Sequence, residues 1–256
     1  MEPSGKCISV DRNPHHVSQA DTTRPVPSQA PSVPQHIGVI LDGNRRWAQA
    51  HRVSLEGAYA AGARRVVDLT TWCDSVGIPL VTVWALSQDN LQRAPETVAR
   101  ILDAVSSGLR LIAAGRRWRI HPIGDLDLLP PAQADRLLKL ADASADATPG
   151  TLNVAVAYDG RADIVAAVRE LVRSGDDRSP RRIGEADVAR HLSTTGQPDI
   201  DLVIRTSGEQ RLSGFMPWQT SEAELYFTDT LWPDFDRSAF HQTLRWYAQR
   251  EQRFGR

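Results

Sequence analysis

The stretch DLVIRTSGEQRLSGFMPWQTSEAELYFTDTLWPDF (residues 201–235) has the same pattern as a second stretch, HIGVILDGNRRWA (residues 36–48). In both, a short run rich in β-branched residues is followed at once by a charged segment that contains glycine. The run predicts a buried strand, and the segment predicts a turn or a helix start at the carboxyl end of that strand. Each of the two stretches therefore indicates the carboxyl end of a strand that is followed by a charged turn or helix start.

The rest of the chain alternates in the same way. Runs typical of strands are 37–41, 80–86, 119–123, 152–158, 202–205 and 225–227, and stretches typical of helices are 57–75, 95–114, 132–147, 161–174, 185–192 and 237–250. Apolar runs interleaved with helices favour a mainly parallel sheet that is covered on both faces. We therefore expect an α/β fold, with six strands in one domain over residues 35–256.

The composition excludes several functional classes. The chain has 256 residues, 41% of them hydrophobic and 24% charged, with a formal net charge of −1, as in ordinary soluble domains. No global basic field attracts nucleic acid. Two cysteines make neither a disulfide framework nor a zinc site. With no apolar span or signal core, we expect a cytoplasmic protein without a transmembrane segment. Residues 1–34, rich in proline and serine, read as a disordered leader.

Charged and polar residues follow several of the predicted strands. Asp42 comes after the first strand, residues 87–93 after the second, 158–161 after the fourth and 205–213 after the fifth. Ligands of open parallel sheets bind beyond the carboxyl ends of the strands. We therefore expect these residues to meet at one edge of the sheet.

The segment DGNRRW at residues 42–47 has the chemistry of an anion site. Gly43 permits a turn that brings backbone amides close to an anion, and the helix dipole assists. Arg45 and Arg46 add positive charge, and Asp42 offers a hard oxygen ligand for Mg²⁺. An ordinary turn with Asp42 as the helix N-cap is the structural alternative.

A second anion site is predicted at residues 205–213, RTSGEQRLS. Arg205, Arg211 and the Ser213 hydroxyl, separated by a glycine turn, can hold a diphosphate by charge-assisted hydrogen bonds. The alternative is that both arginines form surface ion pairs with Glu209 and Asp201. The chain contains no GxxxxGK[ST] and no GxGxxG, so a nucleotide-binding loop is not indicated.

These segments resemble the signature regions of the cis-prenyltransferases, the undecaprenyl diphosphate synthase family, from about residue 34 to the C-terminus. The aspartate-rich motif of the all-helical trans-prenyltransferases is missing. The resemblance implies the fold of that family with a hydrophobic tunnel, Mg²⁺ as cofactor and isoprenoid diphosphates as substrates. It also implies that Arg205, Arg211 and Ser213 hold isopentenyl diphosphate. Glu224 then joins Asp42 on the metal ion.

Further site residues come from the same resemblance. Residues 87–93, SQDNLQR, are similar to the family segment S-x-E-N-W-x-R, with Asp and Leu replacing Glu and Trp. The match implies that Asn90 helps to place the reacting groups and that Ser87 and Arg93 contact substrate. Ser87 as a helix cap is a compatible structural reading. The DGNRRW match adds Gly43, Asn44, Arg45, Arg46 and Trp47 as substrate-binding residues.

The C-terminal residues 253–255, RFG, resemble the family tail that enters the site of a neighbouring subunit. This match implies a homodimer in which Arg253 contributes across the interface, and the family allows peripheral contact with membranes. The motif SGEQRLSGF is most similar to that of short-chain actinobacterial members.

The sequence also departs from the family pattern. Leu55 and Tyr59 stand where long-chain members have an arginine and a histidine that hold the allylic diphosphate, and Glu222 stands where tyrosine is usual. We expect Glu222 to be buried beside the acceptor pocket, which makes branched, lavandulyl-type coupling an alternative product outcome. A non-catalytic partner subunit is a second alternative, disfavoured because Asp42, Arg205 and the other motif residues are present. A phosphohydrolase is disfavoured because no nucleophile is evident.

The expected reaction is condensation of an allylic diphosphate (dimethylallyl or geranyl) with a five-carbon isoprenoid diphosphate, which releases diphosphate. Apolar walls must shield the reacting carbons from water. The candidate wall residues, each of which is also a plausible core residue, are Val66, Leu69, Trp72, Cys73, Val83, Trp84, Ala85, Leu86, Ile101, Leu102 and Leu109. The bulk of Trp72 and Trp84 favours a short product.

Overall fold

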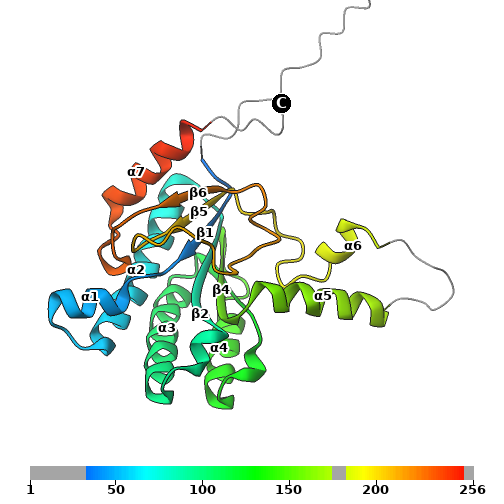
Figure 1. The fold of residues 1–256 in the computed structure, drawn as a ribbon, viewed down its shortest axis with the longest axis horizontal. Helices are drawn as coiled ribbons and strands as arrows, with labels where there is room; N and C mark the ends of the chain where they lie inside the picture. Colours follow the sequence, from blue (N-terminus) through cyan, green and yellow to red (C-terminus); the bar gives the residue numbers. More distant parts are fainter. Residues whose placement is uncertain (1–32, 175–182, 251–256) are drawn as a thin grey trace, which may run out of the picture. The chain divides into compact units, whose positions relative to one another are not determined.

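Six strands form one sheet in the order β3-β4-β2-β1-β5-β6, and every neighbouring pair is parallel (Figure 1). This computed structural model describes residues 33–174 and 183–250. The strands are β1 (His36–Ile40), β2 (Leu80–Ser87), β3 (Trp118–Ile123), β4 (Gly150–Tyr158), β5 (Leu202–Arg205) and β6 (Glu224–Phe227). The predicted single α/β domain with a parallel six-stranded sheet is confirmed. The predicted leader, apart from residues 33 and 34, lies outside the described residues, as does Arg253.

The helices agree with the predicted pattern except at some boundaries. They are α1 (Asn44–His51), α2 (Leu55–Val76), α3 (Pro95–Gly115), α4 (Pro131–Ala143), α5 (Gly160–Ser174), α6 (Glu185–Ala189) and α7 (Arg237–Ala248). Helix α4 is shorter than expected because the Ser144 hydroxyl, which accepts from Ile120 N at 2.9 Å, donates to Ala141 O at 3.0 Å. A short helix α1 precedes α2, and the Ser54 hydroxyl caps α2 by accepting from Gly57 N at 3.0 Å.

The two faces of the sheet are covered differently. Alternate residues such as Val39, Val83 and Val154 face a core shared with α2, α3 and α7. The opposite face, with Ile40 and Val203, packs instead against Phe215 and Met216 of the connection between β5 and β6. The connection after β1 therefore leaves toward one face and the connection after β5 toward the other. Such a divergence between neighbouring parallel strands opens a crevice at their carboxyl ends.

The second face carries a row of polar side chains away from this crevice. Thr82, Asn153 and His121 are level in the strand register. His36 Nδ1–H donates to the Pro198 carbonyl at 2.9 Å, so its Nε2 accepts from the Thr82 hydroxyl at 2.7 Å. Asn153 Nδ2 donates to the same hydroxyl at 2.9 Å. Burial of the ring, only partly offset by the bond to Pro198, lowers the pKa of His36 to about 4. The buried imidazole is thus kept neutral.

Within residues 33–174 and 183–250, we find no helix with the length and apolar character that a membrane span requires.

Candidate active site

A cavity of about 600 Å³ opens at the crevice between β1 and β5 and continues between the sheet and helices α2 and α3. Its rim is polar and its interior apolar. Eleven of the fourteen predicted site residues line it: Asp42, Gly43, Asn44, Arg45, Arg46, Ser87, Asn90, Arg93, Arg205, Arg211 and Ser213. The structure therefore brings together side chains from three separate segments of the chain. Their individual roles remain predictions.

Asp42 is held rigidly where β1 ends. Its backbone N–H donates to the Thr206 hydroxyl at 3.1 Å, and that hydroxyl donates to the Asp42 carbonyl at 2.7 Å. Trp232 N donates to the same carbonyl at 3.0 Å. Thr206 and Trp232 are fully buried. Partners locked by packing preorganise a functional carboxylate.

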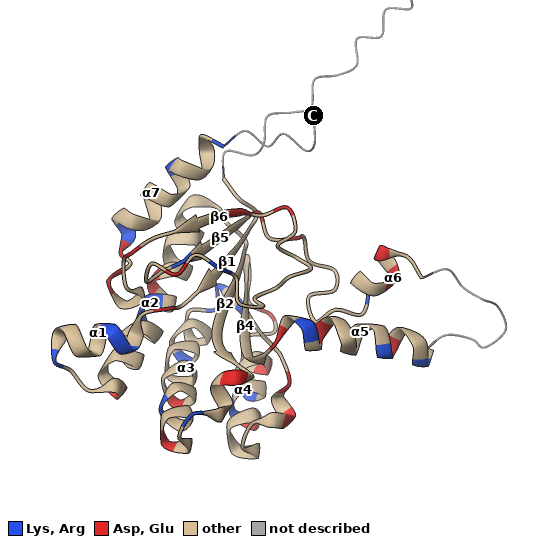
Figure 2. Ribbon diagram, viewed as in Figure 1, with Lys and Arg blue, Asp and Glu red and all other residues tan. Residues whose placement is uncertain are grey.

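Gly43 makes the tight turn from β1 into α1. Its φ of 108° is unfavourable for any residue with a side chain, and a Cβ there would lie 3.1 Å from both Leu231 Cα and Ser207 Cβ. Gly43, rather than Asp42, is the N-cap of α1, with no side-chain cap bond. The alternative that Asp42 is merely a cap is therefore wrong. Figure 2 shows the basic residues of α1 in blue, just after this turn.

Arg205 connects the two predicted anion sites. Its side chain is 5% exposed, and Nη2 donates to Asp42 Oδ2 at 3.0 Å. Nη1 donates to the Ser213 hydroxyl at 3.0 Å and to the Arg211 carbonyl. Its Nε is buried and has no partner among the described residues. A guanidinium fixed between Asp42 and Ser213 places positive charge at the centre of the crevice.

Arg211 and Arg46 reach the cavity from opposite sides of the crevice and share one carboxylate. Arg211 Nη1 donates to Glu209 Oε2, and Arg46 Nη2 lies 3.8 Å from Glu209 Oε1. Arg46 also donates to the Ser207 carbonyl at 2.6 Å. The expected ion pair of Arg211 with Glu209 is thus present. The one expected between Arg205 and Asp201 is not, because Arg205 turns to Asp42 instead.

The segment after β2 supplies the third side of the rim. The Ser87 hydroxyl accepts from Asn90 N at 3.1 Å, but the N-cap of the 3₁₀ turn η1 (Asp89–Gln92) is Gln88 and not the expected Ser87. Arg93 N donates to the Asn90 carbonyl at 3.2 Å. This compact turn points Asn90 and Arg93 toward the same cavity as Asp42.

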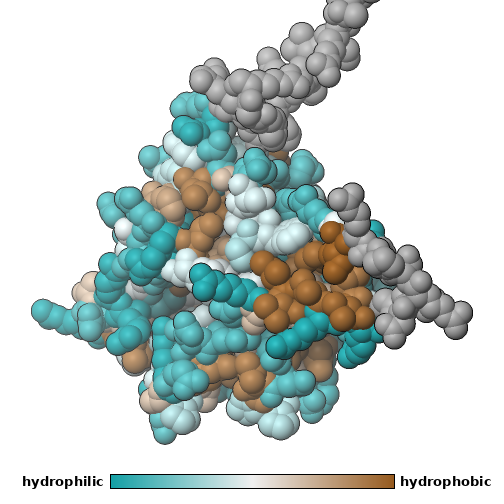
Figure 3. Space-filling model, turned by 45° about the vertical axis from the view of Figure 1, so that its right-hand side comes forward, coloured by the Kyte–Doolittle hydropathy of each residue, from teal (hydrophilic) through white to brown (hydrophobic). Residues whose placement is uncertain are grey.

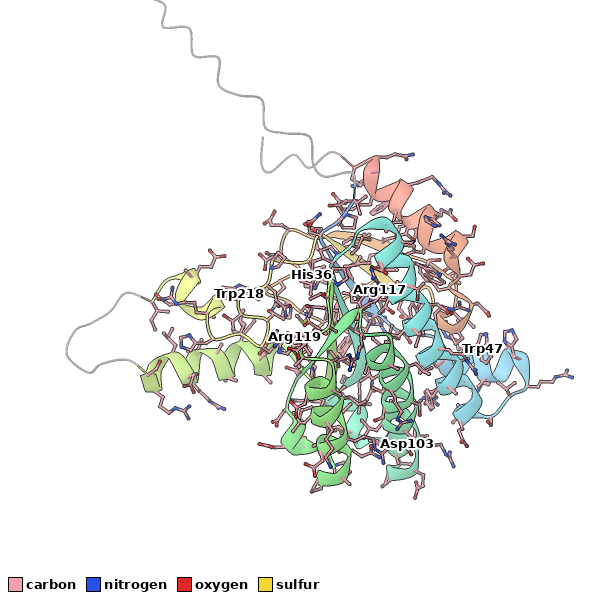
Figure 4. All side chains as sticks on the ribbon, turned by 180° about the vertical axis from the view of Figure 1, so that it is seen from behind. His36, Trp47, Asp103, Arg117, Arg119 and Trp218 are labelled. Atoms are coloured by element: carbon pink, nitrogen blue, oxygen red, sulfur yellow. The ribbon has the colours of Figure 1, made fainter. Side chains whose placement is uncertain are left out.

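Trp47 lies on α1 but does not line the cavity. Its indole N–H donates to Asp234 Oδ1 at 2.7 Å, and its ring stacks on His51 with centroids 4.4 Å apart. Figure 4 shows Trp47 on α1 at the side of the domain, well away from His36 of the sheet. In this structure Trp47 anchors α1 rather than contacting the predicted substrate space.

Within one chain, Asp42 and Glu224 lie too far apart to share a metal ion, so their predicted pairing stays a prediction that requires a second chain. Glu224 begins β6 and is in register with Leu202, which is in register with Ile37 at the start of β1. Asp42 lies five residues beyond Ile37, which at ~3.3 Å per residue separates the two acids by roughly 16 Å along the strands. Glu224 instead accepts from Arg250 Nε at 3.0 Å. A strand pattern marks residues as strand-forming but does not show which end of the sheet they occupy.

Two other expectations also need correction. Glu222 is exposed, lies before β6 at the amino end of the sheet and does not line the cavity. Its carboxylate therefore does not reach the cavity of its own chain. Trp72 packs against Phe240 in the core, with ring centroids 5.7 Å apart, and is not on the cavity wall. Leu69, Cys73 and Leu102 are likewise core residues.

The apolar interior contains the remaining predicted wall residues and several that sequence reasoning missed. The missed ones include Ala63, Ala104, Val105, Gly108, Ile112 and Val154. Ala63 and Gly108 mark a close approach of α2 to α3, since a Cβ on Gly108 would lie 3.2 Å from the Ala63 Cβ. Helical periodicity identifies such positions as buried but does not separate a core contact from a cavity wall.

Asp159 belongs to the segment 158–161 that was expected at this edge of the sheet, and it lies at the rim. It follows β4, lines the cavity and caps α5 through Oδ1, which accepts from Ala162 N at 2.8 Å. The preceding Tyr158 donates to Asp163 Oδ2 at 3.3 Å. Burial, followed by the nearby Asp163 carboxylate, raises the pKa of Tyr158, and burial raises the pKa of Asp163. Both groups brace the start of α5 behind Asp159. Its position directly after a strand is the feature from which the rim location was predicted.

The rim fits a hard divalent cation better than a soft one. Asp42 offers a carboxylate whose side chain is 38% exposed, and the neighbouring Asn44 Oδ1 is buried without a partner among the described residues. The described residues contain no group of three or more His, Cys, Asp or Glu suited to a metal. One carboxylate with few other protein ligands is how Mg²⁺ is commonly held beside phosphates.

Comparisons with known proteins agree with this arrangement. The family described as "Putative undecaprenyl diphosphate synthase" matches residues 40–255. A (2Z,6E)-farnesyl diphosphate synthase of Thermobifida fusca (strain YX) is 44% identical, covering 89% of this chain and 92% of its own length. A short-chain Z-isoprenyl diphosphate synthase of Mycobacterium leprae (strain TN) is 42% identical, covering 88% of each chain.

A solved structure is similar as well. Lavandulyl diphosphate synthase from Lavandula x intermedia, in complex with dimethylallyl diphosphate, superimposes with a TM-score of 0.82 at 34% identity, over 88% of this chain and 99% of that one. Sequence, fold and the residues at the crevice all lead to the same assignment. The chain belongs to the undecaprenyl diphosphate synthase family and is a prenyl transferase.

Proposed function

We propose that this protein condenses an allylic diphosphate, dimethylallyl or geranyl diphosphate, with a five-carbon isoprenoid diphosphate in a Mg²⁺-dependent reaction. One observation carries the proposal. Arg205 joins Asp42 at 3.0 Å to Ser213 at 3.0 Å at the mouth of a cavity whose interior is apolar. Two anion sites beside one apolar cavity suit two prenyl diphosphates and a growing hydrocarbon chain.

The residues divide the chemical work between them. The allylic C–O bond breaks, and the diphosphate leaves with the electron pair while Arg46, Arg205 and neighbouring amides stabilise its charge. The double bond of the five-carbon substrate then attacks the allylic carbon. A proton lost from that substrate sets the new double bond and passes to a diphosphate oxygen, with Asn90 orienting the groups. Bound Mg²⁺, held by Asp42, would neutralise further charge on the leaving group.

The apolar interior supports a short product. At ~30 Å³ per heavy atom, the share of a water molecule in the liquid, a 600 Å³ cavity holds about twenty non-hydrogen atoms. That is close to a short prenyl diphosphate and far below a chain of many tens of carbons. The two relatives named for farnesyl and short-chain Z-isoprenyl products point the same way.

Product analysis tests this proposal directly. The purified protein is incubated with geranyl diphosphate, isopentenyl diphosphate and Mg²⁺, and the dephosphorylated product is identified by chromatography and mass spectrometry. We expect a short linear prenyl alcohol, and we expect a chelator such as EDTA to stop its formation until Mg²⁺ is restored. Release of diphosphate with no new carbon–carbon bond would refute the proposal.

Branched, lavandulyl-type coupling is the second candidate because the similar solved structure is a lavandulyl diphosphate synthase. The exposed position of Glu222 removes the sequence argument for it. Incubation with dimethylallyl diphosphate alone separates the two reactions, since a linear condensation with isopentenyl diphosphate cannot proceed. A branched ten-carbon product in that assay would establish the alternative.

A homodimer is part of the proposal. Helix α5 exposes Val165, Val168 and Val172 on one face, with Ile183 nearby in sequence, at 37–66% exposure, and Figure 3 shows an extended hydrophobic area on this side of the domain. Exposed apolar areas of this kind typically mark an interface. Glu224 can join a metal site only if a second chain completes it.

Two variants test the dimer. Val168→Asp should shift the protein toward a monomer in sedimentation velocity, whereas Val53→Asp, at another exposed valine, should not. Deleting residues 253–256 should lower turnover without lowering the melting temperature. Wild-type protein that sediments as a monomer at micromolar concentration would contradict this assembly.

A further inference from the structure

Asp159 is a half-buried carboxylate that lines the cavity on the side of Ser213, where the five-carbon substrate is expected. The residue after it is bound to the turn that contains Ser213, because Gly160 N–H donates to Gly214 O at 3.2 Å. A Cβ on Gly160 would lie 2.5 Å from the same carbonyl oxygen, so the start of α5 is in close contact with this turn. Asp159 is thereby fixed beside the predicted site of the five-carbon substrate.

The two carboxylate oxygens of Asp159 differ in their contacts. Oδ1 accepts from Ala162 N at 2.8 Å and caps α5. Oδ2 is 3.9 Å from the position that a Cβ on Gly214, the residue after Ser213, would take. In the part of the chain that the structure describes, no lysine or arginine pairs with this carboxylate. Oδ1 therefore has a structural role, whereas Oδ2 is available beside the five-carbon substrate.

A negative charge at this place opposes the binding of a diphosphate, because like charges repel each other strongly beside an apolar interior. An asparagine would cap the helix about as well, since Asn and Asp are nearly equal at an N-cap. The helix dipole adds only a small preference for the charged residue. The cap alone therefore does not account for a carboxylate beside an anion site.

We infer that Asp159 is the general base of the proposed condensation, on which this inference rests. Once C4 of the five-carbon substrate has bonded to the allylic carbon, a cation is left at C3. Asp159 Oδ2 takes a proton from C2, the electron pair of that C–H bond forms the C2–C3 double bond, and the proton then passes to a diphosphate oxygen. Only C1 and an oxygen atom separate C2 from the bound phosphate, so C2 lies close to Ser213 and Asp159.

A carboxylate has the chemistry that this step requires. The cation at C3 makes C2 strongly acidic, so a weak base is sufficient to remove the proton. The same charge attracts the cation while it forms. Since Asp159 repels the bound diphosphate but attracts the cation, it favours the transition state over the bound substrate, which is the condition for a faster reaction.

Asp159→Asn in the full chain tests the inference, because this change removes the charge and retains the cap. We expect kcat to fall about a hundredfold or more. The Kd for isopentenyl diphosphate with Mg²⁺, measured by titration calorimetry, should fall as well, because the repelling charge is gone. With isopentenyl diphosphate deuterated at C2, the isotope effect on kcat should be larger in the variant than in the wild type, because proton removal becomes the slow step.

Asp236→Asn is the matched control. Asp236 caps α7 in the same way, since its Oδ1 accepts from Ala239 N at 2.8 Å, and it does not line the cavity. Both variants should change the melting temperature by no more than about 4 °C. Asp236→Asn should keep the kcat of the wild type.

Three results would overturn the role of Asp159 while the proposed function stands. These are an Asp159→Asn variant that retains most of the wild-type kcat, one that binds isopentenyl diphosphate more weakly than the wild type, and one with an unchanged isotope effect. If the wild type itself forms no condensation product, both the inference and the proposed function fail.

Discussion

Substitution of Gly43 by alanine tests whether the turn after β1 is as constrained as the structure indicates. Alanine at φ 108° lies beyond even the left-handed helical region, at a cost of at least about 1–2 kcal/mol. Its Cβ would meet Leu231 Cδ2 at 3.0 Å and backbone Leu231 Cα at 3.1 Å. Such crowding adds about 1–3 kcal/mol. We therefore expect a total loss of about 3 kcal/mol.

Gly77→Ala separates the two contributions. Gly77 ends α2 with φ 79°, and a Cβ there meets nothing within 4 Å, so only the conformational cost of about 1–2 kcal/mol applies. At roughly 2–4 °C per kcal/mol, the melting temperature should fall by about 6–12 °C for Gly43→Ala and by about half as much or less for Gly77→Ala.

Activity provides the second readout for this pair. Displacing Asp42 and the amides after it by even about 1 Å should lower kcat/KM on the order of a hundredfold in Gly43→Ala. Gly77→Ala should retain wild-type turnover below its melting transition. Differential scanning calorimetry and a diphosphate-release assay measure the two quantities. Equal melting temperatures for the two variants, with full activity in both, would refute the reasoning about this turn.

Two further predictions concern the buried arginine and the buried histidine. Arg205→Lys should reduce kcat/KM at least about a hundredfold, with an unchanged circular dichroism spectrum, because one ammonium cannot span Asp42 and Ser213 as the guanidinium does; activity within twofold of the wild type would contradict this. The pKa of His36 is near 6.5 in the unfolded chain and about 4 in the folded protein. Between these pH values the unfolded chain therefore binds a proton that the folded protein does not bind. Stability is therefore complete above pH 6.5 and is lost as the pH falls toward 4, by about 2 kcal/mol between pH 7 and pH 5 in urea titrations. His36→Gln should flatten this dependence, while His51→Gln, at an exposed site, should leave it unchanged.

Most of the architecture could be predicted before the structure. Strand and helix identities follow from local periodicity, and the parallel sheet follows from their alternation. The residues that meet at the crevice were predictable as well, because Asp42, Ser87 and Arg205 each end or directly follow a parallel strand, and such ends share one edge. These are consequences of chain order alone.

The metal site shows what a local sequence pattern cannot predict, namely the edge of the sheet at which a residue lies. Glu224 stands in a stretch as distinctive as that of Asp42, yet it begins its strand where Asp42 follows one. In a parallel sheet these two positions are at opposite edges, and the register between β5 and β6 decides the matter. The same limit applies to Glu222, which was expected to be buried and is exposed in the structure.

The sequence alone set the order of the elements, the glycine turn at Gly43 and the arginines at the strand ends, because backbone sterics and apolar periodicity act over a few residues. Only the tertiary structure decided that Arg205 turns inward to Asp42, that Trp72 is core while Trp84 lines the cavity, and that the Tyr59 hydroxyl has no partner among the described residues. These outcomes depend on which surfaces of distant segments pack together, and packing is determined by the whole chain at once.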